Sequence, residues 1–122
     1  PPSQAMSISR GDVVLVDYPF SDRTGSKVRP ALVVQADALN HRISDTILAA
    51  ISRSTHRASA TQLFVDISTP EGGRTGLRQD SMIQCENLLT YDQGLILTKI
   101  GEVSAPLSQQ VDACLKAALG LA

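Results

Sequence analysis

The 122-residue sequence contains no tryptophan, and aromatic residues make up only 3% of it. Its apolar residues, 43% of the total, occur in short runs separated by polar residues. A transmembrane helix needs about 20 consecutive apolar residues, and the sequence has no such run. We therefore expect a globular protein that does not use a membrane as a partner.

Cysteine and net charge are also scarce. The two cysteines, Cys85 and Cys114, lack metal-ligand spacing, so we expect free, mostly buried thiols and no metal site. A formal net charge of −1 excludes nucleic-acid binding by bulk electrostatics alone. The charge is uneven, however: the chain up to Arg57 has seven Lys and Arg against five acids, a balance of +2, which leaves −3 for the rest. A local basic surface in the first half is therefore compatible with the composition.

A chain of this length is expected to form one domain. Residues 1–5 precede Met6 and read Pro-Pro-Ser-Gln-Ala, which we interpret as a cloning remnant. The single domain is thus predicted over residues 6–122.

Short β-branched and aliphatic runs, separated by turn-forming residues, predict strands. They lie at Val13–Tyr18, Ala31–Gln35, Thr46–Ser52, Gln62–Ile67, Ser81–Thr90 and Lys99–Val103. Polar loops are predicted from Phe20 to Val28 and through the glycines of residues 70–76, and a single helical turn at Asp37–His41. Apolar residues at helical spacing between Ser104, a candidate N-cap, and Gly120 predict one C-terminal helix. The expected fold is mainly β, a small, strongly curved antiparallel barrel with a C-terminal α-helix.

The stretch from Lys27 to Asp37 suggests where chemistry takes place. Lys27-Val28-Arg29-Pro30 leads directly into an apolar strand, and Pro30 suits a strand's first residue because it cannot donate to the ladder. A guanidinium held at the rim of a sheet donates two parallel hydrogen bonds to phosphate oxygens. Arg29 is therefore a candidate phosphate ligand.

Several motifs together resemble the MazF/PemK-type toxins of bacterial toxin–antitoxin modules. The motifs, in order, are Arg10-Gly11-Asp12-Val13-Val14, Pro19-Phe20-Ser21-Asp22, Lys27-x-Arg29-Pro30-Ala31-Leu32-Val33-Val34, Ala49-Ala50-Ile51-Ser52 and the block from Asp80-Ser81-Met82-Ile83 to Thr90-x-Asp92. The resemblance runs from Ser9 to Leu119, and it is the order and spacing of the motifs that make it specific.

The resemblance implies an SH3-like barrel with a C-terminal helix, usually a homodimer in the bacterial cytoplasm. Such a toxin cuts single-stranded RNA, with a sequence preference, without a metal or other cofactor. The products are a 2′,3′-cyclic phosphate and a 5′-hydroxyl. A cognate antitoxin inhibits the toxin, and operator DNA is bound only through the antitoxin.

The family's catalytic arginine falls on Arg29 and its catalytic hydroxyl, commonly a threonine, on Ser52. Arg29 suits stabilisation of the phosphorane and donation to the leaving 5′-oxygen, and it is a poor base because a guanidinium stays charged. Ser52 can donate to a non-bridging oxygen. Two departures remove side chains that relatives often carry: Thr24 replaces a loop glutamate, and Leu89 replaces an arginine before Thr90.

The resemblance also suggests contacts with RNA and with the antitoxin. The predicted RNA contacts are Phe20, Lys27, Arg53, Glu86 and Asn87. A loop that governs whether RNA or antitoxin reaches the site is predicted at Ser21, Asp22, Arg23, Thr24, Gly25 and Ser26. Phe20 could stack on an unpaired base.

Each assignment has a structural alternative. Arg29 could be a strand-edge arginine paired with an acid such as Glu86, Ser52 a strand-end hydroxyl bonded to backbone, and Glu86 a solvated edge charge. His41 and His56 lie in polar connecting stretches and are interpreted as exposed loop residues.

Two other functions remain for the same barrel. One is a CcdB-like gyrase poison that binds protein without catalysis, although those toxins rely on a tryptophan-containing segment that this sequence lacks. The other is a relative that binds RNA without cutting it.

Overall fold

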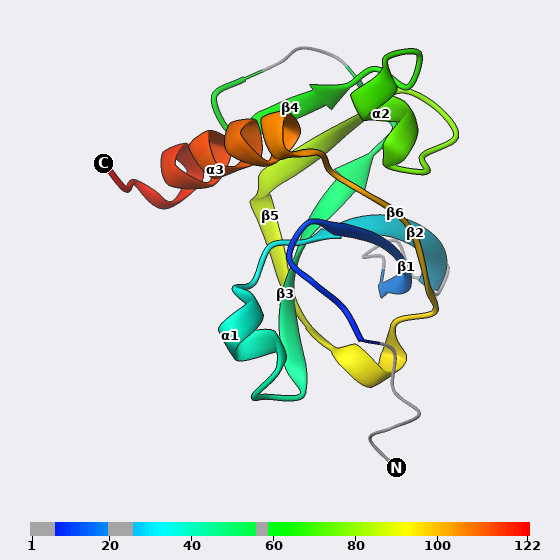
Figure 1. The fold of residues 1–122 in the computed structure, drawn as a ribbon, viewed down its shortest axis with the longest axis vertical. Coiled ribbons are helices and arrows are strands. Elements are labelled where there is room, and N and C mark those ends of the chain that lie inside the picture. The colour runs from blue at the N-terminus through cyan, green and yellow to red at the C-terminus, as the bar shows by residue number, and fades with distance from the viewer. Residues whose placement is uncertain (1–6, 20–25, 56–58) are drawn as a thin grey trace.

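A computed structural model describes residues 7–19, 26–55 and 59–122, which form one antiparallel sheet and three α-helices (Figure 1). The strands are β1 Asp12–Pro19, β2 Ser26–Val33, β3 Asp45–Ser52, β4 Gln62–Val65, β5 Ser81–Asp92 and β6 Thr98–Glu102, and they lie in the order β4-β5-β3-β2-β1-β6. The helices are α1 Asp37–Asn40, α2 Pro70–Arg74 and α3 Ala105–Leu119, with a 3-10 turn, η2, at Gln93–Leu95.

The sheet curves into a half-barrel, and α3 lies beside β4 and β5 at one end of it (Figure 1). Alternating side chains of β1 fill two apolar clusters: Val13 joins one that includes Val111 and Cys114 of α3, whereas Val14 and Val16 join the other. Full burial of a valine or leucine side chain contributes roughly 1.5–3 kcal/mol. The mainly β fold with a C-terminal helix is confirmed.

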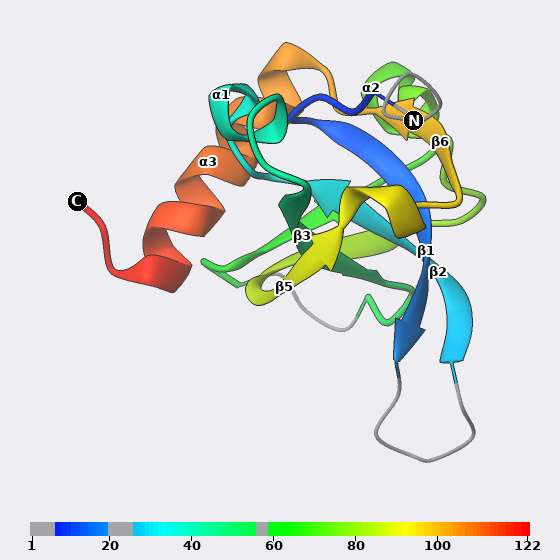
Figure 2. The same ribbon diagram turned by 90° about the horizontal axis from the view of Figure 1, so that it is seen from below.

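The N-terminal part of β2 differs from the prediction. Ser26–Val28, expected to be loop, belongs to β2, and Arg29 lies opposite Val16 of β1 rather than at the rim of the sheet. Pro30 is not the first residue of its strand but the fifth, opposite Leu15. It is tolerated because the pairing of β2 with β3 begins only at Ala31, so one edge of Pro30 is open. Figure 2 shows β1 and β2 running side by side beyond the rest of the sheet.

A helix replaces part of the glycine-rich loop that was expected at residues 70–76. Pro70 opens α2, and the hydroxyl oxygen of Thr69 accepts a hydrogen bond from the Gly72 amide at 3.0 Å, which caps the helix. Two glycines in five residues concealed this helix from propensity arguments.

The remaining elements agree with the sequence predictions. A single helical turn occurs at α1, and β3 covers the predicted strand at residues 46–52. Helix α3 ends at Gly120, whose φ of 71° is the left-handed conformation that favours glycine. Ser104 occupies the N-cap position, but its side chain makes no capping hydrogen bond.

The long strand β5 changes its register with β3 at a defined position. Ala49 of β3 lies opposite Leu88, whereas the next residue, Ala50, lies opposite Gln84. The β5 residues between these partners form a bulge, which displaces Glu86 and Asn87 from the ladder and leaves both exposed.

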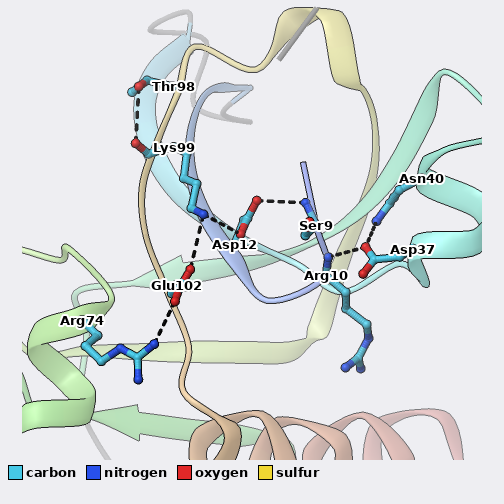
Figure 3. Close-up of polar contacts among 9 residues, drawn as sticks. All are labelled: Ser9, Arg10, Asp12, Asp37, Asn40, Arg74, Thr98, Lys99 and Glu102. Atoms are coloured by element: carbon cyan, nitrogen blue, oxygen red, sulfur yellow. Dashed lines mark hydrogen bonds and ion pairs between the residues drawn. The ribbon is translucent and has the colours of Figure 1, made fainter. Parts of the chain in front are cut away.

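Charged side chains of β1, β6 and α2 contact one another at one edge of the sheet (Figure 3). The Lys99 ammonium lies 3.1 Å from Asp12, whose side chain is 6% exposed, and 3.4 Å from Glu102. Its hydrogen bond with Asp12 raises the pKa of Lys99. Glu102 also pairs with Arg74 at 2.8 Å, so these charges connect β1, β6 and α2.

Candidate nucleic-acid interface

The two predicted catalytic residues lie on adjacent strands, Arg29 on β2 and Ser52 at the end of β3. Their register pairs Ala31 with Ala50 and Leu32 with Ala49. If this register is extended two residues beyond Ala31, past the last observed pair, Arg29 corresponds to Ser52 on the same face of the sheet. Both side chains are partly buried. A guanidinium and a hydroxyl therefore lie at the end where β2 and β3 cease to pair.

The Ser52 hydroxyl has one identified backbone contact. Its oxygen accepts a hydrogen bond from the Ser54 amide at 3.0 Å, which agrees with the structural alternative considered for this residue. A serine hydroxyl has one donor and two acceptor sites. The contact with Ser54 therefore restrains the oxygen while its hydrogen can still be donated to a ligand.

A groove of about 470 Å³ opens beside this end of β2. Among the described residues, four cationic side chains and no acidic one contribute to its lining. The lining residues are Leu15, Lys27, Val28, Arg29, Pro30, Arg53, Gly76, Leu77, Arg78, Gln79, Ser81 and Ile100. A concave surface lined by one sign of charge attracts ligands of the opposite sign, so the groove suits a phosphate-bearing ligand.

The structure gathers some predicted site residues and separates others. Lys27, Arg29 and Arg53 all line the groove, and Ser52 precedes Arg53 in the chain. Glu86 and Asn87 lie in the β5 bulge and do not line it. Glu86 accepts a hydrogen bond from the Gln62 side chain, and the Asn87 amide donates to Gln84 at 3.3 Å.

The predicted stacking residue and most of the predicted loop lie outside the described residues. This applies to Phe20 and to Ser21, Asp22, Arg23, Thr24 and Gly25. Ser26, the last residue assigned to the loop, begins β2. His56 also lies outside the described ranges, whereas His41 is exposed at the end of α1, as predicted.

Arg78 and Gln79 were not predicted to be functional residues, and Ser81 was named only as part of a motif. All three line the groove, on the segment between α2 and β5. The only sequence signal for Arg78 is that it is a cation two residues before the Asp80-Ser81 motif. This signal is weak, because an ordinary surface charge would look the same. Only the tertiary structure shows that Arg78 lines the same groove as the β2 residues.

Neither cysteine is suited to act as a nucleophile. Cys85 and Cys114 are free and buried, as predicted. Burial raises the pKa of the Cys85 thiol to about 12, so it stays protonated at neutral pH. Within the described ranges, no three His, Cys, Asp or Glu side chains gather as a metal site would require, and no helix is long and apolar enough to cross a membrane.

The curved six-stranded sheet, its C-terminal helix and its cationic groove define a class of small half-barrel proteins suited to phosphate-bearing ligands. Residues 9–119 match the family described as PemK-like, MazF-like toxin of type II toxin–antitoxin systems, and the chain belongs to this family.

Curated relatives are similar over nearly the whole chain. The chain is 32% identical over 120 residues to the endoribonuclease EndoA of Bacillus subtilis (strain 168), covering 95% of this chain and 97% of EndoA. It is 31% identical over 119 residues to the endoribonuclease MazF6 of Mycobacterium tuberculosis (strain ATCC 25618 / H37Rv), covering 95% and 100%. The homologues are thus endoribonucleases.

Solved structures share the fold. An endoribonuclease in complex with its cognate antitoxin, from a mycobacterial species, superposes with a TM-score of 0.75 at 22% identity, covering 94% of this chain and 97% of the other. A MazE–MazF complex from Deinococcus radiodurans (form III) gives 0.70 at 16% identity, covering 96% and 100%. These matches confirm the MazF-like half-barrel.

Proposed function

We propose that this protein is the toxin of a type II toxin–antitoxin module and cuts single-stranded mRNA in the bacterial cytoplasm. The cut is a metal-independent transesterification that leaves a 2′,3′-cyclic phosphate and a 5′-hydroxyl. The observation that carries the proposal is the cationic groove that Arg29 and Arg53 line, with Ser52 next to Arg53 in the chain, in a family whose relatives are endoribonucleases.

Arg29 acts on the charge that develops at phosphorus. Attack by the 2′-hydroxyl on the phosphodiester produces a phosphorane with additional negative charge on its non-bridging oxygens. The guanidinium donates two parallel hydrogen bonds to such oxygens and stays charged at physiological pH. Its pairing with β1 holds the backbone of Arg29 in extended conformation, which reduces the reorganisation needed during reaction.

Ser52 supplies a second donor to the same phosphate. Its oxygen is restrained by the Ser54 amide, so the hydroxyl hydrogen is left for a non-bridging oxygen. A preorganised donor of this kind contributes roughly 3 kcal/mol to transition-state stabilisation.

The proposed protein partner is a cognate antitoxin, and relatives solved in complex with antitoxins support this proposal. An antitoxin that covers the groove would exclude RNA, because the same cations attract either an acidic peptide or a polynucleotide. A homodimer of the toxin, bound to operator DNA through the antitoxin, completes the proposed assembly.

The first experiment incubates the purified protein with a pool of unrelated transcripts in excess EDTA. We expect discrete cuts whose 5′ ends accept phosphate from polynucleotide kinase without prior phosphatase treatment. Mapping the cut ends also gives the preferred sequence. Intact RNA after long incubation would reject the enzyme and favour a gyrase poison or a non-cutting RNA-binding relative.

Arg29→Ala tests the site itself. Loss of the guanidinium is expected to lower the cutting rate at least about 100-fold, since the transition state loses its main charge partner. Arg42→Ala is the matched control, because Arg42 is exposed beyond α1 and does not line the groove. Circular dichroism should show the same fold for both variants. Equal cutting by Arg29→Ala and Arg42→Ala would reject Arg29 as the catalytic residue.

A further inference from the structure

The groove has a second side that the proposed chemistry does not use. Arg29 and Lys27 enter it from β2, whereas Arg53 follows β3 and Arg78 precedes β5. The segment that carries Arg78 comes from a part of the chain about 50 residues beyond Arg29. Two cations therefore lie in the groove apart from the strand that carries the proposed catalytic arginine.

The segment that presents Arg78 is held in place by its backbone. Gly76 has a φ of 74°, and a Cβ atom there would lie 2.0 Å from the Ile100 carbonyl oxygen, so the segment packs directly on β6. Thr75 is fully buried, and its hydroxyl donates to the Gly72 carbonyl at 2.6 Å. Ser81 donates to the Gln79 carbonyl at 2.9 Å. Arg78 thus projects from a fixed support rather than from a loose loop.

The charge of Arg78 is not compensated within the described part of the chain. Arg78 takes part in none of the salt bridges identified among the described residues, which involve Arg10, Arg74 and Lys99. Asp80, the acid closest in sequence to Arg78, does not line the groove and accepts a hydrogen bond from the Ile67 amide. The guanidinium of Arg78 is therefore available to an anionic ligand.

The rest of the lining combines apolar side chains with a few polar atoms, which matches a nucleobase better than a bare ion. Leu15, Pro30, Leu77 and Ile100 supply hydrocarbon surface, and Gln79 and Ser81 supply polar atoms. A volume of about 470 Å³ lies in the range of pockets that hold small organic ligands. A phosphate alone would leave the apolar part of the groove without a contact.

We propose that Arg78 is a substrate-binding residue, which holds the nucleotide adjoining the scissile phosphate in this groove. Arg78, assisted by Arg53, binds that nucleotide's own phosphate, and its base lies against the apolar lining. The inference rests on the proposed function, since the ligand is the RNA substrate. Arg78 then acts in substrate binding, apart from the transesterification at Arg29 and Ser52.

The test measures binding of a non-cleavable RNA that carries a 2′-deoxy residue at the mapped cut site. Arg78→Ala should weaken binding about tenfold, because one charge-assisted contact is lost. It should also lower the slope of log affinity against log salt by about 0.7, the value for one phosphate of a single strand. Arg42→Ala should change neither quantity. For cleavable RNA, KM should rise and kcat should remain within about twofold.

Neutral methylphosphonates, placed one at a time along the same RNA, locate the contact. At one phosphate next to the cut, the substitution should weaken binding to the wild-type protein and abolish the penalty of Arg78→Ala. If no methylphosphonate, or only the one at the scissile phosphate, abolishes the penalty of Arg78→Ala, the proposed role of Arg78 is overturned. It is also overturned if Arg78→Ala binds RNA as Arg42→Ala does. If the wild-type protein neither cuts nor binds RNA, the proposed function fails with it, and the two failures are thus distinguishable.

Discussion

For Ser52, the resemblance predicts a catalytic hydroxyl, whereas the structure shows a hydrogen bond to the backbone. Its hydroxyl oxygen accepts from Ser54, so a bond to backbone and a bond to phosphate are compatible. A threonine at this position keeps the hydroxyl and restricts its rotamer.

Removal of the Ser52 hydroxyl should affect the chemical step. We expect Ser52→Ala to lower kcat about 10- to 100-fold with KM nearly unchanged, because the donor acts on charge that develops in the transition state. Ser52→Thr should keep or raise kcat. Single-turnover kinetics on the mapped RNA measures both variants, and full activity in Ser52→Ala would show that this hydroxyl serves only the backbone.

Cys85 gives the protein a dependence on alkaline pH. Its folded pKa, about 12, lies above the ordinary thiol value of 9.0 because burial disfavours the thiolate. Below pH 9 the thiol is protonated in both states and the effect is absent. Between pH 9 and 12 the unfolded chain releases a proton that the folded chain keeps, so the free energy of unfolding falls as pH rises.

Urea unfolding at pH 7.5 and pH 10, with reductant present, measures this effect. Cys85→Ala should be less stable at pH 7.5, since a buried side chain is truncated, but it should lose less stability between the two pH values than the wild type does. An equal loss of unfolding free energy in both proteins would show that a group other than Cys85 causes the alkaline sensitivity.

The sequence identified candidate site residues that belong to a motif. It did not identify residues that reach the groove only because distant parts of the chain pack together. The assignment of Arg29 and Ser52 follows from the resemblance, because each stands at a motif position of the family. Arg78 could not be assigned in this way, since it reaches the groove only where the segment after α2 packs on β6. Such a contact between distant parts of the chain leaves no periodic pattern.

At the scale of elements, the approach of the α2–β5 segment to β6 depends on glycine. A Cβ at Gly101 of β6 would lie 2.4 Å from the Arg74 carbonyl oxygen, and one at Gly76 would meet Ile100. Backbone lies against backbone here, so neither position has room for a side chain.

Gly76→Ala should therefore destabilise the fold by more than about 2 kcal/mol, since it combines a backbone clash with a positive φ. Gly73→Ala is the matched control: it lies in α2, where an added Cβ makes only an ordinary contact with Ile67, and should be neutral or stabilising by about 0.5–1 kcal/mol. Urea unfolding followed by far-UV circular dichroism suits a protein without tryptophan. Equal stability of the two variants would contradict the close packing.

The elements that sequence reasoning misassigned share a cause. Ser26–Val28 carry a turn-like composition but pair with β1, and Pro70–Arg74 are glycine-rich but form a capped helix. In both cases a partner supplied by the tertiary structure outweighed a weak local preference. The C-terminal helix α3 was predicted correctly because its apolar residues recur at helical spacing. Strand β3 was predicted correctly because a short aliphatic run, buried as a continuous stretch, is bounded by polar residues.

At the scale of the whole molecule, Arg10 connects parts that the sheet alone does not join. Its Nε donates to the Val34 carbonyl at 2.9 Å, and its guanidinium pairs with Asp112 of α3 at 2.9 Å. Its backbone amide donates to Asp37 at 2.7 Å, which lowers the pKa of that carboxyl (Figure 3). The end of β2, the start of α1 and the C-terminal helix thus meet at one residue.

Arg10→Ala should lower the free energy of unfolding by about 1–2 kcal/mol, because a backbone carbonyl and a half-exposed carboxylate lose their donor. Asp112→Asn should cost less than about 1 kcal/mol, since it weakens the ion pair and leaves the bond to Val34 intact. Arg42→Ala, an exposed arginine with no such contacts, should stay within about 0.5 kcal/mol of the wild type. Urea unfolding of the three variants under one buffer condition ranks them, and an Arg10→Ala variant as stable as Arg42→Ala would show that α3 is held by its apolar face alone.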